Sequence, residues 1–166
     1  MSERDAALDD GRSETHNERA DRNWDELLQE LRVTQTGTQI LTGFLLTIPF
    51  QARFEELDGY QRNLYLVLVV IAVLATALMV APVAMHRALF RRRLKQELVV
   101  VGSLFAKAGL VTLALVMAGG AMLLFDVVLS REAGRWVGGA TLVVLGAFWW
   151  LLPKLVGRRA GDDDRA

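Results

Sequence analysis

The sequence predicts an all-α integral membrane protein, a four-helix bundle preceded by an amphipathic interfacial helix. Three observations predict this class. The hydrophobic residues, 52% of the chain, gather in four long stretches that carry almost no charge. Each stretch approaches the ~20 residues that a helix needs to cross the hydrocarbon core of a bilayer. Finally, Lys and Arg are divided unequally between alternate connecting segments, as in membrane proteins of fixed orientation.

The totals also exclude several classes of function. With 166 residues the chain has room for about four spans and little else, which excludes a large multidomain enzyme. It has no Cys, and its two histidines, His16 and His86, lack the spacing of metal ligands. No glycine-rich phosphate loop and no nucleophile paired with a base is visible. We therefore expect no catalytic activity, no cofactor and no metal site.

The chain opens on a polar segment, residues 1–23, which lacks the features of a secretory signal and is expected to be disordered. Residues 24–32 then place apolar side chains at i, i+3, i+4 and i+7, on one face of a helix. These side chains are Trp24, Leu27, Leu28 and Leu31. We expect this segment to be an amphipathic helix that lies at the membrane surface and runs into the first span.

The first predicted span, residues 33–52, is unusually polar. Five uncharged polar side chains recur at spacings of three and four and should form one stripe: Thr34, Gln35, Thr38, Gln39 and Thr42. One interpretation is a lining for an ion or a small polar solute. The other is hydrogen bonding to a neighbouring helix or back to carbonyls of the same helix. The second is favoured, because uncharged side chains cannot by themselves carry a proton.

A loop with the turn signal Asp58-Gly59 leads to the second span, residues 64–85, which holds no charge. The next loop, residues 86–97, is the most basic segment. Its cations are Arg87, Arg91, Arg92, Arg93 and Lys95. Such a loop suits the anionic inner leaflet of a bilayer and predicts a lipid anchor. Nucleic-acid binding is the alternative, but four spans and an acidic N-terminal segment argue against it.

The third span is expected at residues 108–125, with Lys107 before it and Asp126 after it. A charge at membrane depth suggests a functional site. Lys107 can instead extend its ammonium group to the lipid headgroups, and Asp126 can be an exposed carboxylate at a helix end. The fourth span, residues 136–153, is followed by a polar tail, residues 154–166.

Counting Lys and Arg gives an orientation. The two terminal segments and the loop 86–97 together hold fourteen, whereas the other two loops hold four. Because cytoplasmic loops carry the excess of positive charge, both termini should be cytoplasmic. Small residues mark candidate helix contacts, which are Ala77 with Ala81, Ala114, Ala118 and Met122 beside Gly119 and Gly120, and Gly139 with Gly146.

Two blocks carry a resemblance to a known family. One runs from Glu18-Arg-Ala-Asp-Arg-Asn-Trp through Gln51, and the other begins His86-Arg-Ala-Leu-Phe. In these blocks the chain resembles small four-helix membrane proteins of uncharacterised function from high-GC Gram-positive bacteria. Members of that family often carry the automatic name sodium:proton antiporter. The resemblance implies a place in the bacterial cytoplasmic membrane, and it makes transport of sodium ions and protons an alternative function.

Exchange of sodium for protons normally requires a carboxylate inside the membrane, and no predicted span contains one. The expected function is therefore that of a structural or interaction component in a lipid bilayer, acting as a homo-oligomer or with another membrane protein. The alternative is an oligomeric ion transporter that uses the Thr34 to Thr42 stripe, Lys107 and Asp126.

Overall fold

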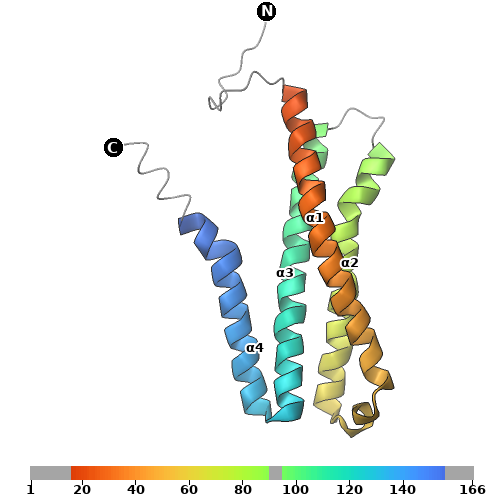
Figure 1. The fold of residues 1–166 in the computed structure, drawn as a ribbon, viewed down its shortest axis with the longest axis vertical. Coiled ribbons are helices and arrows are strands. Elements are labelled where there is room, and N and C mark those ends of the chain that lie inside the picture. Colours follow the sequence, from red (N-terminus) through yellow and green to blue (C-terminus); the bar gives the residue numbers. More distant parts are fainter. Residues whose placement is uncertain (1–15, 90–94, 156–166) are drawn as a thin grey trace, which may run out of the picture.

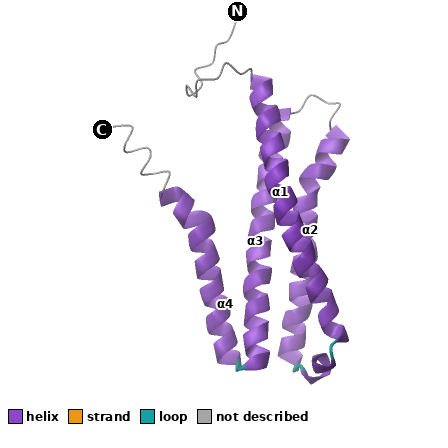
Figure 2. Cartoon of the chain, in the orientation of Figure 1, coloured by secondary structure: helices purple, strands orange, loops and turns teal. Residues whose placement is uncertain are grey.

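The structure, a computed structural model, describes residues 16–89 and 95–155, with side chains over residues 22–85 and 100–155. Within these ranges the chain is helical and contains no strand, as predicted (Figure 2). The long helices are α1 (His16–Thr47), α2 (Gly59–Leu89), α3 (Lys95–Val128) and α4 (Arg131–Gly146). Two short turns, η1 (Ile48–Phe50) and η2 (Ala52–Glu56), join α1 to α2, and a π-helical turn, η3 (Ala147–Leu151), extends α4.

Three of the helical segments are long and apolar enough to cross a membrane: Gly59–Met85, Val100–Val128 and Arg131–Leu155. The second half of α1 is not among them, because its apolar residues alternate with Thr and Gln. It does lie beside α2, since the hydroxyl oxygens of Thr42 and Thr76 are 3.5 Å apart halfway along that helix. The first span thus stays a prediction, although α1 runs alongside a helix that could cross the membrane.

The helices form a layered bundle with two different ends. The connections from α1 to α2 and from α3 to α4 lie together at one end, which we call the hairpin end (Figure 1). The start of α1 and the end of η3 both lie toward the other end, which we call the open end. Helices α1, α2 and α3 contact one another, whereas the body of α4 packs against α3 alone among the long helices.

The core lies between α1, α2 and α3. One buried cluster joins Leu45, Ala72 and Val116, one residue from each helix. A second cluster nearer the hairpin end contains Tyr65, whose hydroxyl donates a hydrogen bond of 3.0 Å to the carbonyl of Leu45. Because lipid is as apolar as these side chains, close packing and hydrogen bonds hold such helices together more than the hydrophobic effect does.

The N-terminal segments differ from the prediction. Residues 16–23, expected to be disordered, already belong to α1, while residues 1–15 lie outside the described part. Residues 24–32 are helical and continuous with the rest of α1, as expected of a helix that runs into the first span, and their position at a membrane surface stays a prediction. Helix α3 begins at Lys95, before the predicted third span at 108–125. It therefore offers Gly102 as a partner, where an added Cβ would lie 2.8 Å from the Trp24 ring.

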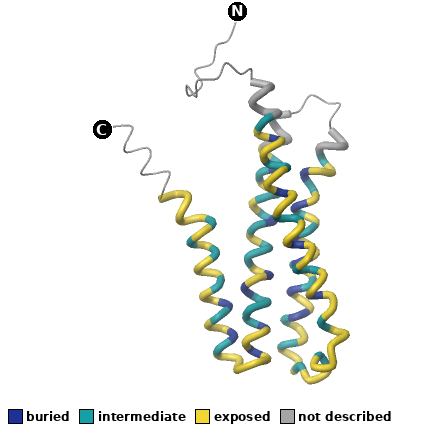
Figure 3. The backbone as a smooth tube through the Cα atoms, in the orientation of Figure 1, coloured by how far each residue is buried: buried dark blue, intermediate teal, exposed yellow. Residues whose placement is uncertain are grey.

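The glycines that bring α4 to α3 are not the predicted pair. Gly139 and Gly146 are not packed against a neighbouring helix, since a Cβ added to either would meet nothing within 4 Å. Gly134 and Gly138 are buried instead, and an added Cβ would lie 2.6 Å from the carbonyl oxygen of Met122 and 2.8 Å from its Cβ, respectively. Figure 3 shows the consequence, since α4 is buried only toward the hairpin end.

Candidate functional site

Four polar residues from three helix ends form a closed ring of contacts at the hairpin end, which we call the polar ring. Asp58 and Gln61 stand at the start of α2, Asp126 lies near the end of α3, and Arg131 opens α4. Each member contacts two others by a hydrogen bond or an ion pair. Because α2 and α3 pack antiparallel and a short connection joins α3 to α4, residues far apart in the sequence meet there (Figure 1).

Asp58 and Gln61 cap the first turn of α2 reciprocally. The backbone N–H of Gln61 donates to Oδ1 of Asp58 at 2.9 Å, and the backbone N–H of Asp58 donates to Oε1 of Gln61 at 3.1 Å. Two amide groups that a helix start leaves without partners are satisfied in this way. The Gln61 N–H, followed by the nearby charge of Arg131, holds the pKa of the Asp58 carboxyl below its ordinary value of 3.8. Asp58 is therefore an anion at neutral pH.

Asp126 is buried, with only 3% of its side chain exposed. Its Oδ1 accepts a hydrogen bond of 2.7 Å from the side-chain amide of Gln61. Its Oδ2 lies 3.7 Å from Nε of Arg131 and accepts no hydrogen bond from the described residues. The backbone of α4 covers it, because a Cβ added to Gly134 would lie 3.0 Å from Cβ of Asp126. A glycine thus lets one helix close over a carboxylate on its neighbour.

Arg131 closes the ring from the first residue of α4. One of its terminal nitrogens lies 2.5 Å from Oδ2 of Asp58, and its guanidinium carbon lies 4.4 Å from the centre of the Tyr60 ring. The preceding residue, Ser130, fixes this helix start, because its hydroxyl accepts a hydrogen bond from the backbone N–H of Ala133. Arg131 is half exposed and reaches two carboxylates on different elements.

The geometry of the polar ring is that of a clamp between helix ends. One guanidinium stands against two carboxylates, and an amide links the buried carboxylate to the cap of α2. Over the described ranges no group of three or more His, Cys, Asp or Glu side chains could hold a metal ion. Separating the partners of a partly buried ion pair leaves an uncompensated charge, which costs free energy. The pair between Asp126 and Arg131 therefore resists separation of α3 from α4.

Three members of the Thr and Gln stripe point toward α2. The side-chain amide of Gln35 donates a hydrogen bond of 2.6 Å to the carbonyl of Met79. The buried hydroxyl of Thr38 donates to the carbonyl of Thr34 and lies 3.6 Å from the sulfur of Met79. Thr42 donates to the carbonyl of Thr38 and faces Thr76. These contacts match the interhelical and same-helix hydrogen bonds that were one of the two interpretations.

The other two members behave differently. The hydroxyl of Thr34 donates to the carbonyl of Glu30, one turn earlier. Gln39 is exposed and lies outside the face that continues Leu31 and Leu45, because it follows Thr38 by about 100° of helix rotation. The five residues thus do not share one face, and the structure separates Gln39 from the rest of the stripe.

The charged candidates are not brought together. Lys107 is exposed on the open-end half of α3, while Asp126 lies in the polar ring at the hairpin end. Of the predicted lipid anchor, Arg91, Arg92 and Arg93 lie outside the described residues. Arg87 and Lys95 fall in the last turn of α2 and the first of α3, with side chains outside the described part.

Three ring members, Asp58, Gln61 and Arg131, were not predicted as site residues. The sequence holds a signal for the first two, because an acceptor followed three residues later by Gln is the spacing of a reciprocal helix cap. Gly134 and Gly138 likewise have the spacing that allows close approach of membrane helices. No local signal pairs Gln61 with Asp126, which follows it by 65 positions.

Comparison with known proteins identifies a family. Residues 13–153 match the model of a family described as a family of unknown function, DUF6328. No curated protein matches the chain, and no solved structure does.

Proposed function

The chain belongs to DUF6328, a family of unknown function, and we propose that it is an integral membrane protein without catalytic activity that acts by self-association. The partner in this proposal is a second copy of the chain. The observation that carries it is a polar, small-residue face of α1 that points out of the bundle. We call this the outer face of α1 and define it by Thr36, Gln39 and Gly43, all exposed.

The outer face lies at membrane depth in this proposal, because the neighbouring Thr42 contacts the middle of α2. The hydroxyl of Thr36 is satisfied by the carbonyl of Arg32 at 3.0 Å. The amide of Gln39 makes no hydrogen bond to any part of the chain that the structure describes. An amide that faces hydrocarbon without a partner costs several kcal/mol, roughly 4–8 on a water-to-cyclohexane scale. A polar partner on another helix removes that cost.

A second copy supplies that partner. A Cβ added to Gly43 would meet nothing within 4 Å, so the backbone of α1 is open to close approach there. In a twofold pair the same patch meets itself, which would place the Gln39 amides opposite each other as donor and acceptor. Hydrogen bonds between membrane helices contribute roughly 0.6–2 kcal/mol each, and small residues allow the backbones to approach.

The proposal includes an orientation in the bacterial cytoplasmic membrane, with both termini cytoplasmic. The distribution of positive charge supports this orientation. The two terminal segments and the loop 86–97 carry fourteen Lys and Arg residues, whereas the two loops at the hairpin end carry four. The orientation is also supported by the described chain ends, which lie toward the same end of the bundle (Figure 1).

The test is energy transfer between labelled full-length chains in lipid vesicles, measured as the chain is diluted in lipid. Gln39→Leu and Gly43→Leu should each lower association about three- to thirtyfold, as expected for loss of one interhelical hydrogen bond or of close packing. Gly37→Leu is the matched control for Gly43→Leu, because Gly37 is also exposed and open but lies on another side of α1. Association that is absent in the parent chain, or unchanged in both variants, would refute the proposal.

One observation favours ion transport as a second candidate. Asp126 is a buried carboxylate within a segment that could cross the membrane, and one of its oxygens accepts no hydrogen bond from the described residues. A proton or sodium site needs such a group. The neighbouring Arg131 already supplies a positive charge to that oxygen, at 3.7 Å, which favours the clamp.

A further inference from the structure

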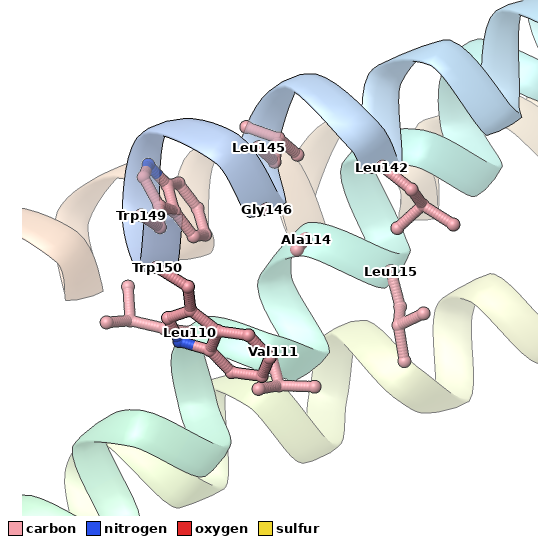
Figure 4. Close-up of a pocket in the computed structure, with 9 residues that line it drawn as sticks. All are labelled: Leu110, Val111, Ala114, Leu115, Leu142, Leu145, Gly146, Trp149 and Trp150. Carbon is pink, nitrogen blue, oxygen red and sulfur yellow. The ribbon is translucent and has the colours of Figure 1, made fainter. Parts of the chain in front are cut away.

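An apolar groove runs between α3 and α4 toward the open end. The two helices meet closely at Gly134 and Gly138, and Figure 1 shows them diverging beyond that contact. The groove has a volume of about 180 Å³. Its walls include Leu110, Val111 and Ala114 of α3 and Gly146, Trp149 and Trp150 from the end of α4. In Figure 4 the Trp150 indole reaches from the α4 side across to Leu110 and Val111.

Two lysines flank the open-end mouth of this groove. Lys107 precedes Leu110 and Val111 by three and four residues, so it stands on the groove-facing side of α3, one turn beyond the wall. Lys154 follows Trp150 by four residues on the other wall. Because α3 and α4 are antiparallel, both lysines come at the same end. Lys154 is exposed, and Lys107 is open to its surroundings as well.

We propose that this groove is a binding site for an anionic phospholipid, with an acyl chain between the helices and the phosphate between Lys107 and Lys154. The apolar walls suit the chain, and the two ammonium groups suit the headgroup. Tryptophan is the residue that favours the boundary between hydrocarbon and headgroups, where Trp149 and Trp150 then lie. Basic pockets between membrane helices on the cytoplasmic side are known to bind anionic headgroups.

The charges distinguish lipid from a protein occupant. A helix of a second copy seated in the groove would cover two lysines that need water or an anion, at a cost in desolvation. A lipid phosphate neutralises them and leaves them at the interface, which their long side chains can reach. The site is separate from the proposed self-association, because the outer face of α1 lies on a different helix and the body of α4 packs against neither α1 nor α2.

The experiment uses the full chain with Trp24→Phe and Trp136→Phe, so that of its four tryptophans only Trp149 and Trp150 emit. Fluorescence is measured in phosphatidylcholine vesicles that contain a minor fraction of brominated lipid, either phosphatidylglycerol or phosphatidylcholine. We expect phosphatidylglycerol to quench at a lower mole fraction. Unlabelled phosphatidylglycerol should restore the emission, whereas unlabelled phosphatidylcholine should not. Equal quenching by the two brominated lipids would overturn the proposal. This result would come from the chain with an unchanged groove, so it does not depend on the folding of a groove variant.

Variants then locate the site. Lys107→Gln and Lys154→Gln should each weaken the preference for phosphatidylglycerol about fivefold, the typical contribution of one basic residue at an anionic surface. Gly146→Leu should abolish the preference for phosphatidylglycerol by filling the groove, whereas the matched Gly139→Leu, also open but outside the groove, should leave it unchanged. A preference that survives both lysine changes would place lipid binding elsewhere and overturn the assignment. So would crosslinking that shows a second copy in the groove.

Discussion

Asp126 is held by a glycine above it and by two polar neighbours beside it. Gly134 allows the α4 backbone to cover the carboxylate, and Arg131, three residues earlier, reaches back to its Oδ2. Gln61 supplies the hydrogen bond to Oδ1 from another helix. At this scale the carboxylate has the surroundings of a structural ion pair, because the opposite charge and the amide are supplied by the elements it joins.

Asp126→Ala should lower the free energy of unfolding by about 1–3 kcal/mol, because it leaves the Gln61 amide without its acceptor and Arg131 with one carboxylate instead of two. Asp126→Asn should lower it less, since the amide oxygen can still accept from Gln61. Thermal unfolding in detergent micelles measures both. Glu132→Ala is the control, because Glu132 is an exposed acid next to Arg131 and should change stability by less than about 0.5 kcal/mol. If Asp126→Ala and Glu132→Ala lowered the free energy of unfolding equally, the proposed structural role of Asp126 would be wrong.

At the scale of the helix, α1 and α4 show how one element can present two kinds of surface. The inward side of α1 directs its polar groups to α2, through Gln35 and Thr42, while its outer face is left open. The glycines of α4 also fall into a packed pair and an open pair. Gly134 and Gly138 lie against α3, and Gly139 and Gly146 do not. Neighbouring positions of one residue type thus have opposite packing roles.

Gly134→Ala and Gly139→Ala should therefore change stability in opposite directions. The Cβ at residue 134 would lie 2.6 Å from a backbone oxygen of α3, so α4 must shift away and stability falls. The Cβ at residue 139 meets nothing, and stability should rise by up to about 0.5–1 kcal/mol because Gly is the poorer helix former. Unfolding by denaturant titration in micelles gives both values. Two variants that shift stability in the same direction would contradict the packing of α4 on α3.

At the scale of the whole molecule, the hydrophobic runs were enough to predict helices and an all-α bundle. Helix lengths were predicted less well, because α1 already begins at His16, and α3 begins before its predicted span, where Gly102 packs against Trp24. The burial of Asp126 was left open by the sequence, since it depends on Gly134 of the next helix. The polar ring was not predicted, because its contacts join residues up to 73 positions apart and leave no periodic pattern.

The proposal that the chain works by association rather than by transport unites these features. Gln35 and Thr42 of α1 and the members of the polar ring contact other helices in the structure, and Gln39 is open to a second copy. Lys107, the remaining ionisable candidate, lies at the far end of α3 from Asp126, so the two do not form one ion site.

The most direct test is sodium-driven proton flux across proteoliposomes that contain the purified full-length chain, with a pH-sensitive dye inside. The account predicts flux equal to that of vesicles without protein, for the parent chain and for Asp126→Asn alike. Flux above that background in the parent chain, lost in Asp126→Asn and retained in Glu132→Gln, would contradict it and make Asp126 part of an ion pathway.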